Sequence, residues 1–331
     1  MAMHRFAHAS ASSIEEAVDV LGESCRPIAG GTDLVALMKD DLEVPERLVN
    51  LKTIPGMTGV MARPDGLHIG ALTTLSMLAS DAAIASRPAM TVLVEAIGQS
   101  ASPQLRHMAT VGGNLLQRPR CWYYRNHRVP CWRKGGQRCF AFQGENKYHT
   151  ILGGGPCYAV HPSDPGVALL ALGASALLVG PRDRRTVPLE SFYRLPKRDY
   201  YWANGYHPVT VLEPNEVVAE IIIPAANSAA RSVYVKITER GTWDFALVSA
   251  AVSLVVSGGG VEAVSIALGG VAPVPWRARA AEAALSGKAL DDDVIEQVAA
   301  ASVANARPLA RNRYKVDLVK SALSQALRSL R

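Results

Sequence analysis

The sequence lacks a long, unbroken apolar run. Its longest apolar stretches, residues 169–179 and 245–256, are short and interrupted by serine or glycine, so neither is expected to cross a bilayer. Residues 1–13 also lack the apolar core of a secretory signal. We therefore expect no membrane span and no export signal of the chain's own. The protein would lie in the cytoplasm, or in the periplasm if a signal-bearing partner carried it there.

Several catalytic and nucleotide-binding motifs are missing as well. The chain contains neither the G-x-G-x-x-G dinucleotide fingerprint nor the G-x-x-x-x-G-K-[ST] phosphate loop. It has no H-E-x-x-H zinc motif and no Ser/His/Asp set with supporting motifs. These absences argue against a P-loop enzyme, a Rossmann-type dehydrogenase and a hydrolase of either familiar kind.

The chain also lacks a strong excess of charge of either sign. Its 331 residues include 35 basic and 29 acidic side chains, and the net charge of +6 does not by itself indicate nucleic acid. Hydrophobic residues make up 49% and charged residues 19%, a composition that can bury a large core. The length predicts two domains, and the small and polar residues 225–230 place the junction between domains 1–226 and 227–331.

Periodicity and turn signals predict a mixed α/β fold of the α+β class. In the first domain they indicate a capped helix after Ser13, a strand, glycine turn and helix over residues 26–38, and a loop over 102–117. Strands are expected at residues 47–51, 67–71 and 217–223, helices at 75–85 and 89–97, and a helix followed by a strand within 168–179. In the second domain, strands at 233–237, 246–256 and 262–268 predict a three-stranded antiparallel sheet, with helices at 278–285, 292–304 and 316–330.

Two glycine turns are candidate phosphate sites. Gly30 and Gly31, followed by Thr32 and Asp33, stand between a predicted strand and a predicted helix, where backbone N–H groups can meet a phosphate. A second glycine pair lies within residues 109–114. Each turn alone is more often ordinary turn chemistry. A pyrophosphate would require both turns to meet in space.

The motifs around these turns resemble the flavoprotein subunits of the xanthine dehydrogenase family. Residues 27–34 resemble the first FAD loop of that family, and residues 106–114 resemble the second. Residues 161–164, 218–224 and 240–246 also match the family's order of motifs. Residues 267–273 resemble its C-terminal domain, so the resemblance covers nearly the whole chain.

The resemblance implies a two-lobed FAD-binding domain of the PCMH type, followed by a small sheet-and-helix domain. Gly30 and Gly31 would give amides to the pyrophosphate, and Thr110 and Asn114 would bond phosphate or ribityl oxygens. Lys236 would lie near the flavin end and offset negative charge on the reduced ring. The implied FAD site comprises Arg26, Pro27, Ile28, Ala29, Gly30, Gly31, Thr32, Asp33, Leu34, Thr110, Gly113, Asn114, Asp164, Val218 and Lys236.

Four of the five cysteines are clustered in residues 118–158, a long segment with little apolar periodicity. Cys25 stands apart, whereas Cys121, Cys131, Cys139 and Cys157 lie within a 37-residue window. A structureless loop of this length is unusual in a compact domain, so the cysteines are expected to hold it. Their spacing lacks the pairs two to four residues apart that zinc sites usually have, and disulfides or simple burial remain open.

The residues around the cysteines favour an anionic centre. Seven cations and no acid lie between residues 118 and 138, and they would stabilise the negative charge of a thiolate-bound cluster. From spacing alone, an iron–sulfur cluster and zinc are about equally expected, and the charged surroundings favour the cluster. The aldehyde oxidoreductase type of the family carries an extra [4Fe-4S] cluster, and this resemblance implies Cys121, Cys131, Cys139 and Cys157 as its ligands.

The function implied by the resemblance is electron transfer within a larger oxidoreductase. The chain would take electrons from [2Fe-2S] centres on a small partner, hold them on FAD and pass them to an external acceptor. The organic substrate, an aldehyde or N-heteroaromatic compound, would be oxidised at a molybdopterin on a large partner. Two rival interpretations are a stand-alone FAD oxidase and, from the aromatic and basic residues near the cysteines, a zinc-stapled nucleic-acid-binding protein.

Overall fold

The N-terminal lobe is a small parallel sheet covered by two helices. The computed structural model describes residues 3–198, 207–225, 229–241 and 243–331. Strand order in the lobe is β1-β3-β2, and both pairs are parallel. Its elements are β1 (Ala7–Ser10), α1 (Ile14–Val20), β2 (Cys25–Ile28), α2 (Leu34–Lys39) and β3 (Arg47–Asn50). The predicted cap of α1 is present, because Ser13 Oγ accepts the Glu16 N–H at 3.1 Å.

The second lobe is built on a five-stranded sheet of order β4-β5-β8-β6-β7, whose neighbouring strands are all antiparallel. Its strands are β4 (Val60–Arg63), β5 (Gly66–Gly70), β6 (Ser175–Val179), β7 (Arg184–Pro188) and β8 (Val217–Pro224). The pairing of β5 with β8 joins segments that lie far apart in the sequence. The chain between β5 and β6 therefore returns to the same sheet after building helices and the cysteine-rich segment.

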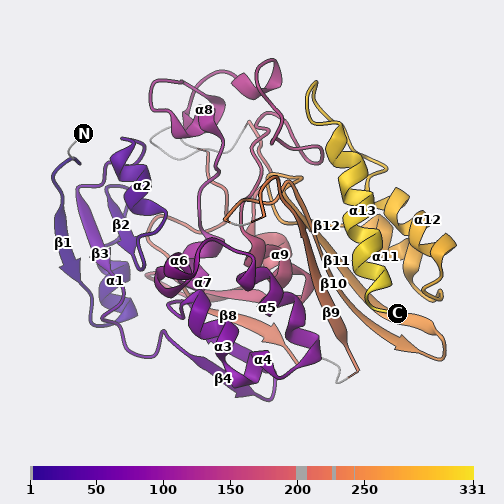
Figure 1. The fold of residues 1–331 in the computed structure, drawn as a ribbon. Coiled ribbons are helices and arrows are strands. Elements are labelled where there is room, and N and C mark those ends of the chain that lie inside the picture. Colours follow the sequence, from indigo (N-terminus) through magenta and orange to yellow (C-terminus); the bar gives the residue numbers. More distant parts are fainter. Residues whose placement is uncertain (1–2, 199–206, 226–228, 242) are drawn as a thin grey trace.

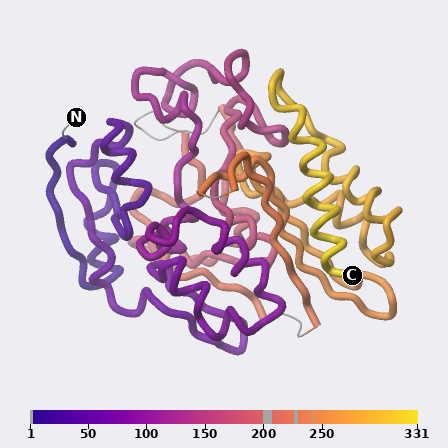
Figure 2. Tube along the Cα trace, viewed as in Figure 1, coloured from indigo at the N-terminus to yellow at the C-terminus, as the bar shows by residue number. Residues whose placement is uncertain are grey.

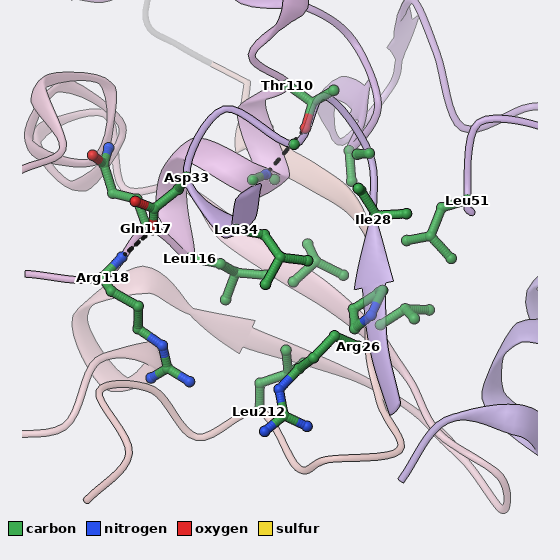
Figure 3. Close-up of a pocket in the computed structure, with 18 of the residues that line it drawn as sticks. Arg26, Ile28, Asp33, Leu34, Leu51, Thr110, Leu116, Gln117, Arg118 and Leu212 are labelled. Atoms are coloured by element: carbon green, nitrogen blue, oxygen red, sulfur yellow. Dashed lines mark hydrogen bonds between the residues drawn. The ribbon is translucent and has the colours of Figure 1, made fainter. Parts of the chain in front are cut away.

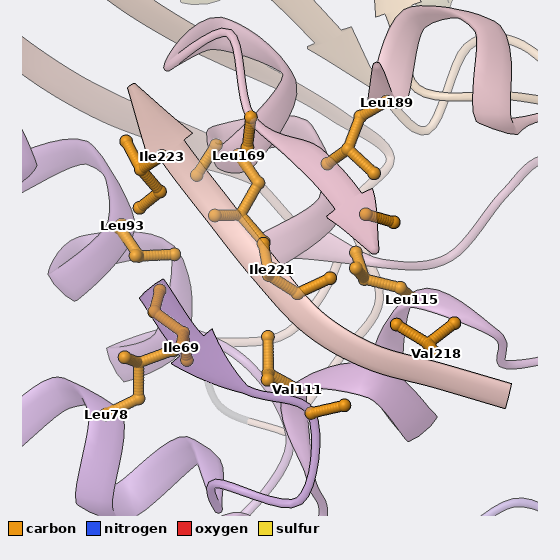
Figure 4. Packing of buried hydrophobic residues seen from close by; sticks show 14 of the residues in the cluster. Ile69, Leu78, Leu93, Val111, Leu115, Leu169, Leu189, Val218, Ile221 and Ile223 are labelled. Carbon is orange, nitrogen blue, oxygen red and sulfur yellow. The ribbon is translucent and has the colours of Figure 1, made fainter. Parts of the chain in front are cut away.

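The helices of the second lobe pack against this sheet in one hydrophobic core. They are α3 (Leu75–Ser80), α4 (Ala82–Ala85), η1 (Pro88–Met90), α5 (Thr91–Gly98), α6 (Pro103–Met108), α7 (Val111–Leu115), α9 (Asp164–Ala171) and α10 (Leu189–Phe192). Figure 4 shows side chains from β5, α7 and α9 meeting those of β8. Ile69, Leu78, Leu93, Leu115, Leu169 and Ile221 are all fully buried there.

The loop predicted over residues 102–117 is instead two short helices, α6 and α7. Ser102 caps α6 by accepting the Leu105 N–H, and Pro103 occupies its first turn. Thr110 caps α7 by accepting the Gly113 N–H at 3.2 Å. The glycine pair misled the prediction, because glycine disfavours a helix interior unless surrounding contacts hold it. The predicted helix at 75–85 is also divided, with α4 beginning anew after Asp81.

The C-terminal part forms a second sheet with helices. The predicted three-stranded sheet has a fourth strand, so its order is β12-β11-β10-β9. The extra strand is two residues long, too short to leave a periodic pattern. The elements are β9 (Arg231–Ile237), β10 (Val248–Ser257), β11 (Gly260–Gly269), β12 (Trp276–Arg277), α11 (Arg279–Leu285), α12 (Asp292–Ser302) and α13 (Tyr314–Arg328).

Strand β10 serves two cores at once. Val248, Ala250 and Val252 belong to the core beneath α13, whereas Ala251 and Val255 face the core of the second lobe. This alternation is the two-residue period of a strand that is buried on both faces. The C-terminal sheet is thereby packed between its own helices and α5 and α9 of the second lobe.

The cysteine-rich segment lies across the end of the molecule, between the N-terminal lobe and the start of α13 (Figures 1 and 2). It contains α8 (Trp122–Arg125), η2 (Trp132–Lys134) and η3 (Phe140–Phe142). Tyr124 and Cys131 pack against Leu37 of α2. On the other side, buried Lys315 of α13 donates to the Tyr148 carbonyl at 3.0 Å. Among the described residues, no helix has the length and apolar character needed to cross a bilayer.

Ile221→Ala tests the core that joins the lobes. Ile221 is fully buried on β8, so its truncation should leave a cavity and lower the free energy of unfolding by about 2–5 kcal/mol. The matched control is Met61→Ala on β4, because Met61 is 50% exposed and its loss should change stability by less than about 0.5 kcal/mol. Guanidinium denaturation followed by circular dichroism compares the two. Equal effects would contradict the assignment of this core.

Candidate functional site

The two glycine turns meet in the structure. A Cβ atom added to Gly30 would lie 1.9 Å from the carbonyl oxygen of Met108, at the end of α6. Gly31 has a φ of +68°, a backbone conformation that side chains other than glycine rarely adopt. Thus the glycines are required for two reasons, close backbone approach at Gly30 and conformation at Gly31. The condition that a pyrophosphate site needs both turns together is met.

A cavity of about 240 Å³ lies between the turns and is shown in Figure 3. Its walls are largely apolar, with side chains such as Ile28, Leu51, Leu116 and Leu212 around it. Among the predicted site residues, the cavity is lined by Arg26, Pro27, Ile28, Ala29, Gly30, Gly31, Thr32, Asp33, Leu34, Thr110, Gly113 and Val218. Asn114, Asp164 and Lys236 lie elsewhere.

Asp164 and Lys236 form a second group, with Asn114 close by through Ser163. Lys236 Nζ donates to Asp164 Oδ2 at 2.8 Å, and the lysine side chain is only 2% exposed. Tyr234 donates to the other carboxylate oxygen, Asp164 Oδ1, at 2.6 Å. Burial, and after it the charge of Asp164, raises the pKa of the tyrosine, so its hydroxyl keeps the proton that it donates. Ser163 donates to Asn114 Oδ1 at 2.5 Å. These contacts join β9, α7 and the start of α9 in one buried polar network.

The network borders a second cavity of about 380 Å³. Asp164 is on its wall, together with Arg120, His149, His161 and Phe245. Burial lowers the pKa of His149 to about 4 and that of His161 to about 3, so both rings are neutral near pH 7. These two histidines and Arg120 are not among the site residues predicted from the sequence. The only sequence signal for them is proximity to the motif at residues 161–164 and to Cys121.

Several buried polar atoms on this wall lack a hydrogen bond. Arg120 Nε, His149 Nδ1 and His161 Nε2 have no partner of normal geometry among the described residues, although backbone groups of Asn146 and Leu115 act on the two rings. An unpaired buried polar group costs about 1–3 kcal/mol. A ligand with polar ring edges, such as a flavin, would offset that cost here.

Asp33 does more than line the first cavity. Its carboxylate accepts the Arg118 backbone N–H at 2.7 Å, and it accepts Arg120 Nη1 and Arg125 Nη2 at 2.8 Å each. The side chain of Asp33 therefore ties the first glycine turn to the start of the cysteine-rich segment. Arg120 continues the connection, because its guanidinium lies over the Phe245 ring at 5.3 Å. One carboxylate thus links the two cavities.

The four clustered cysteines are brought together, although not around a single point. Among the described residues, no three His, Cys, Asp or Glu side chains converge closely enough to hold one metal ion. The Cys139 thiol nevertheless donates to Cys157, which lowers the pKa of Cys157 and raises its own. Charge on Cys157 also raises the pKa of Cys121 and Cys131, after the larger effect of burial. The fifth, Cys25, instead borders the first cavity.

Backbone N–H groups near each of the four sulfurs act to lower the pKa of that thiol, although burial and the neighbouring cysteines raise the pKa of Cys121, Cys131 and Cys139 overall. These N–H groups belong to residues 123 and 124 for Cys121, 133 and 134 for Cys131, 141 and 158 for Cys139, and 159 for Cys157. His149 Nε2 also lies 3.2 Å from Cys121 Sγ. Amides directed at sulfur are the usual surroundings of a ligating thiolate, so the segment has donors suited to a thiolate-bound centre.

The fold and the two linked cavities define an FAD-binding flavoprotein, and comparisons with known proteins place it in a family. Residues 4–226 match the family described as the FAD binding domain in molybdopterin dehydrogenase. Residues 233–330 match the CO dehydrogenase flavoprotein C-terminal domain. The chain therefore belongs to the family of FAD-binding medium subunits of the molybdenum hydroxylases, and it is an oxidoreductase subunit.

Individual relatives agree with this assignment. The chain is 35% identical to the aldehyde oxidoreductase FAD-binding subunit PaoB of Escherichia coli strain K12, over 92% of this chain and 91% of that protein. It is 29% identical to the carbon monoxide dehydrogenase medium chain of Hydrogenophaga pseudoflava, over 97% of each. Membership in this family displaces the nucleic-acid interpretation. The names of these relatives mention no iron–sulfur cluster, so the [4Fe-4S] cluster stays a prediction.

Solved structures show the same architecture. The carbon monoxide dehydrogenase of Hydrogenophaga pseudoflava that lacks the Mo-pyranopterin moiety has a chain that matches with a TM-score of 0.77 and 30% identity, over 99% of this chain and 98% of that one. Quinoline 2-oxidoreductase of Pseudomonas putida 86 matches with a TM-score of 0.76 at 22% identity, over the same shares. The second likeness concerns the fold alone.

Gly30→Ala tests the contact between the glycine turns. The added methyl group must push the Met108 carbonyl away, and overpacking of this kind costs about 1–3 kcal/mol. FAD binding should weaken by about tenfold or more. Gly22→Ala is the control, because a Cβ there meets nothing within 4 Å. Fluorescence titration with FAD measures both affinities, and unchanged binding by a folded Gly30→Ala chain would refute a role for this contact.

Proposed function

We propose that this chain is the electron-transfer flavoprotein subunit of a molybdopterin-dependent oxidoreductase. FAD, when bound, supplies a carrier that accepts electrons at one site and releases them at another. The chain itself binds and orients the cofactor. The observation that carries the proposal is the pair of glycine turns, which meet at a cavity linked through Asp33 and Arg120 to a second cavity beside Asp164 and Lys236.

In this proposal, each of the two cavities holds a different part of FAD. Gly30 and Gly31 direct amides at the diphosphate, while the apolar lining of the first cavity holds the adenosine portion. Thr110 and Gly113 line the first cavity, and Asn114 accepts a hydrogen bond from Ser163 on the wall of the second. These residues would meet the phosphate and ribityl oxygens. Lys236, which Asp164 holds beside the second cavity, would offset negative charge on the reduced ring.

The organic substrate is oxidised on a partner chain. We assign that reaction to a molybdopterin-containing large subunit and the intermediate electron transfer to a [2Fe-2S] small subunit, in a heterotrimer or its dimer. The likeness to an aldehyde oxidoreductase subunit favours an aldehyde as substrate, and an N-heteroaromatic compound is the alternative that other relatives support. An external acceptor then removes the electrons from this chain.

We also assign a [4Fe-4S] cluster to Cys121, Cys131, Cys139 and Cys157. The cage of such a cluster separates its four ligand sulfurs, so they need not converge on one point as the ligands of a single ion do. The N–H groups directed at every sulfur support this assignment. Support also comes from Arg133, a buried cation whose Nε donates to Cys157 Sγ at 3.4 Å.

The test of the function is anaerobic purification of the chain together with its partners. Flavin absorbance bands, and reduction of the flavin on addition of an aldehyde, are the expected results. The isolated chain, loaded with FAD, should not oxidise the aldehyde. Aldehyde oxidation by the isolated chain would overturn the subunit assignment in favour of a stand-alone oxidase.

Cys139→Ser tests the cluster. The wild-type chain should contain about four irons beyond those of the small partner, as a thiolate-bound cubane requires, and the variant should lose most of them. Cys25→Ser is the matched control and should keep the iron, because Cys25 lies apart from the other four. Iron and zinc analysis of the purified complexes measures whether the cysteines hold this cluster. One zinc per chain with no extra iron would overturn the cluster and leave the FAD assignment standing.

A further inference from the structure

The cations of the cysteine-rich segment are not equivalent. Asp33 forms ion pairs with both Arg120 and Arg125, and Glu43 lies 3.8 Å from Arg118. These carboxylates come from the N-terminal lobe, so the acid-free stretch in the sequence is not acid-free in space. Arg138 lies exposed over the Phe140 ring at 4.9 Å. Most of the charge that the sequence places near the cysteines is therefore paired or directed to solvent.

Arg133 differs from all of these. It is 4% exposed, and the charged or ionisable groups that act most strongly on it are Cys157, Tyr124 and Cys131, none of which is a carboxylate. Its Nε donates to Cys157 Sγ at 3.4 Å. A buried cation without an anion is strongly unfavourable. The residue therefore requires negative charge at the cysteine sulfurs.

The backbone holds Arg133 in this position from both sides. Arg133 is the middle residue of η2, and its carbonyl oxygen accepts the His207 N–H at 3.1 Å. Its Nη1 donates back to the His207 carbonyl at 3.4 Å. The neighbouring Trp132 ring stacks on the His207 ring at 3.6 Å. The guanidinium is thus fixed with Nε directed at Cys157.

We infer that Arg133 is a positioning residue that raises the reduction potential of the centre bound by the four cysteines. This inference rests on the proposed [4Fe-4S] cluster. Reduction adds one electron and no proton, so the charge at the sulfurs becomes more negative by one unit. A fixed cation stabilises the reduced form more than the oxidised form, and it does so most effectively where water is excluded.

The experiment is a redox titration of the intact complex, followed by the electron paramagnetic resonance signal of the reduced [4Fe-4S] centre. Arg133→Gln removes the charge but keeps an amide donor, and it should lower the potential of this centre. Arg133→Lys keeps the charge and should restore most of the wild-type potential. Arg138→Gln removes the same charge from an exposed position of the same segment and should change the potential much less.

The outcomes separate this inference from the cluster assignment. Absence of the extra iron from the wild-type chain overturns the cluster, and the role of Arg133 with it. A wild-type potential in iron-loaded Arg133→Gln overturns the role of Arg133 alone. If Arg133→Gln cannot hold iron, the potential of the Arg133→Lys variant is the deciding measurement. An Arg133→Lys potential close to that of the wild type supports the role of charge, whereas an Arg133→Lys potential well below that of Arg138→Gln overturns it.

Discussion

The carbonyl oxygen of Met108 occupies the space that a side chain on Gly30 would need, and the rest of the site depends on this backbone contact. It joins the first glycine turn, which follows β2, to the second, which opens α7. Because the contact is between two main chains, it fixes the separation of the turns more closely than side chains could. The cavity with its apolar lining forms between them, and the buried network beginning at Thr110 leads on to Asn114 and Ser163.

The C-terminal sheet contributes to the site through a small side chain on β10 as well as through the lysine that it supplies. The side of β10 that faces the second lobe carries the small residue Ala251, which allows α5 and α9 to approach the sheet closely. That approach brings Lys236 of β9 to Asp164 at the start of α9. An ion pair between residues so distant in sequence forms only because two cores share one strand. The C-terminal part therefore supplies Lys236 to the polar network beside the second cavity, which is part of the flavin site in the proposed function.

Much of this arrangement could be predicted from the sequence, and the failures have a common cause. The cap at Ser13, the strands at β5 and β8 and the antiparallel set from β9 to β11 were predictable because each has a strong local pattern. The helix α7 was missed because Gly112 and Gly113 normally disfavour a helix. Here the Gly112 N–H donates to the Ala71 carbonyl at 2.9 Å, and the Gly113 N–H donates to Thr110 Oγ. The partners of Arg120 and Arg125 could not be predicted, since a sequence does not show which distant carboxylate will lie beside a basic segment.

The same limit explains why counting charges was a poor guide to electrostatics. A run of cations near cysteines predicts a positive field, but Asp33 and Glu43 from the N-terminal lobe lie beside three of the seven cations, Arg118, Arg120 and Arg125. Those pairs anchor the segment to the first glycine turn, so their role is structural. Among the cations that Asp33 and Glu43 do not pair with, Arg133 has the lowest exposure, and burial strengthens its interaction with nearby charge. Position relative to solvent, and not the number of basic residues, therefore determines which cation acts on the cysteine sulfurs.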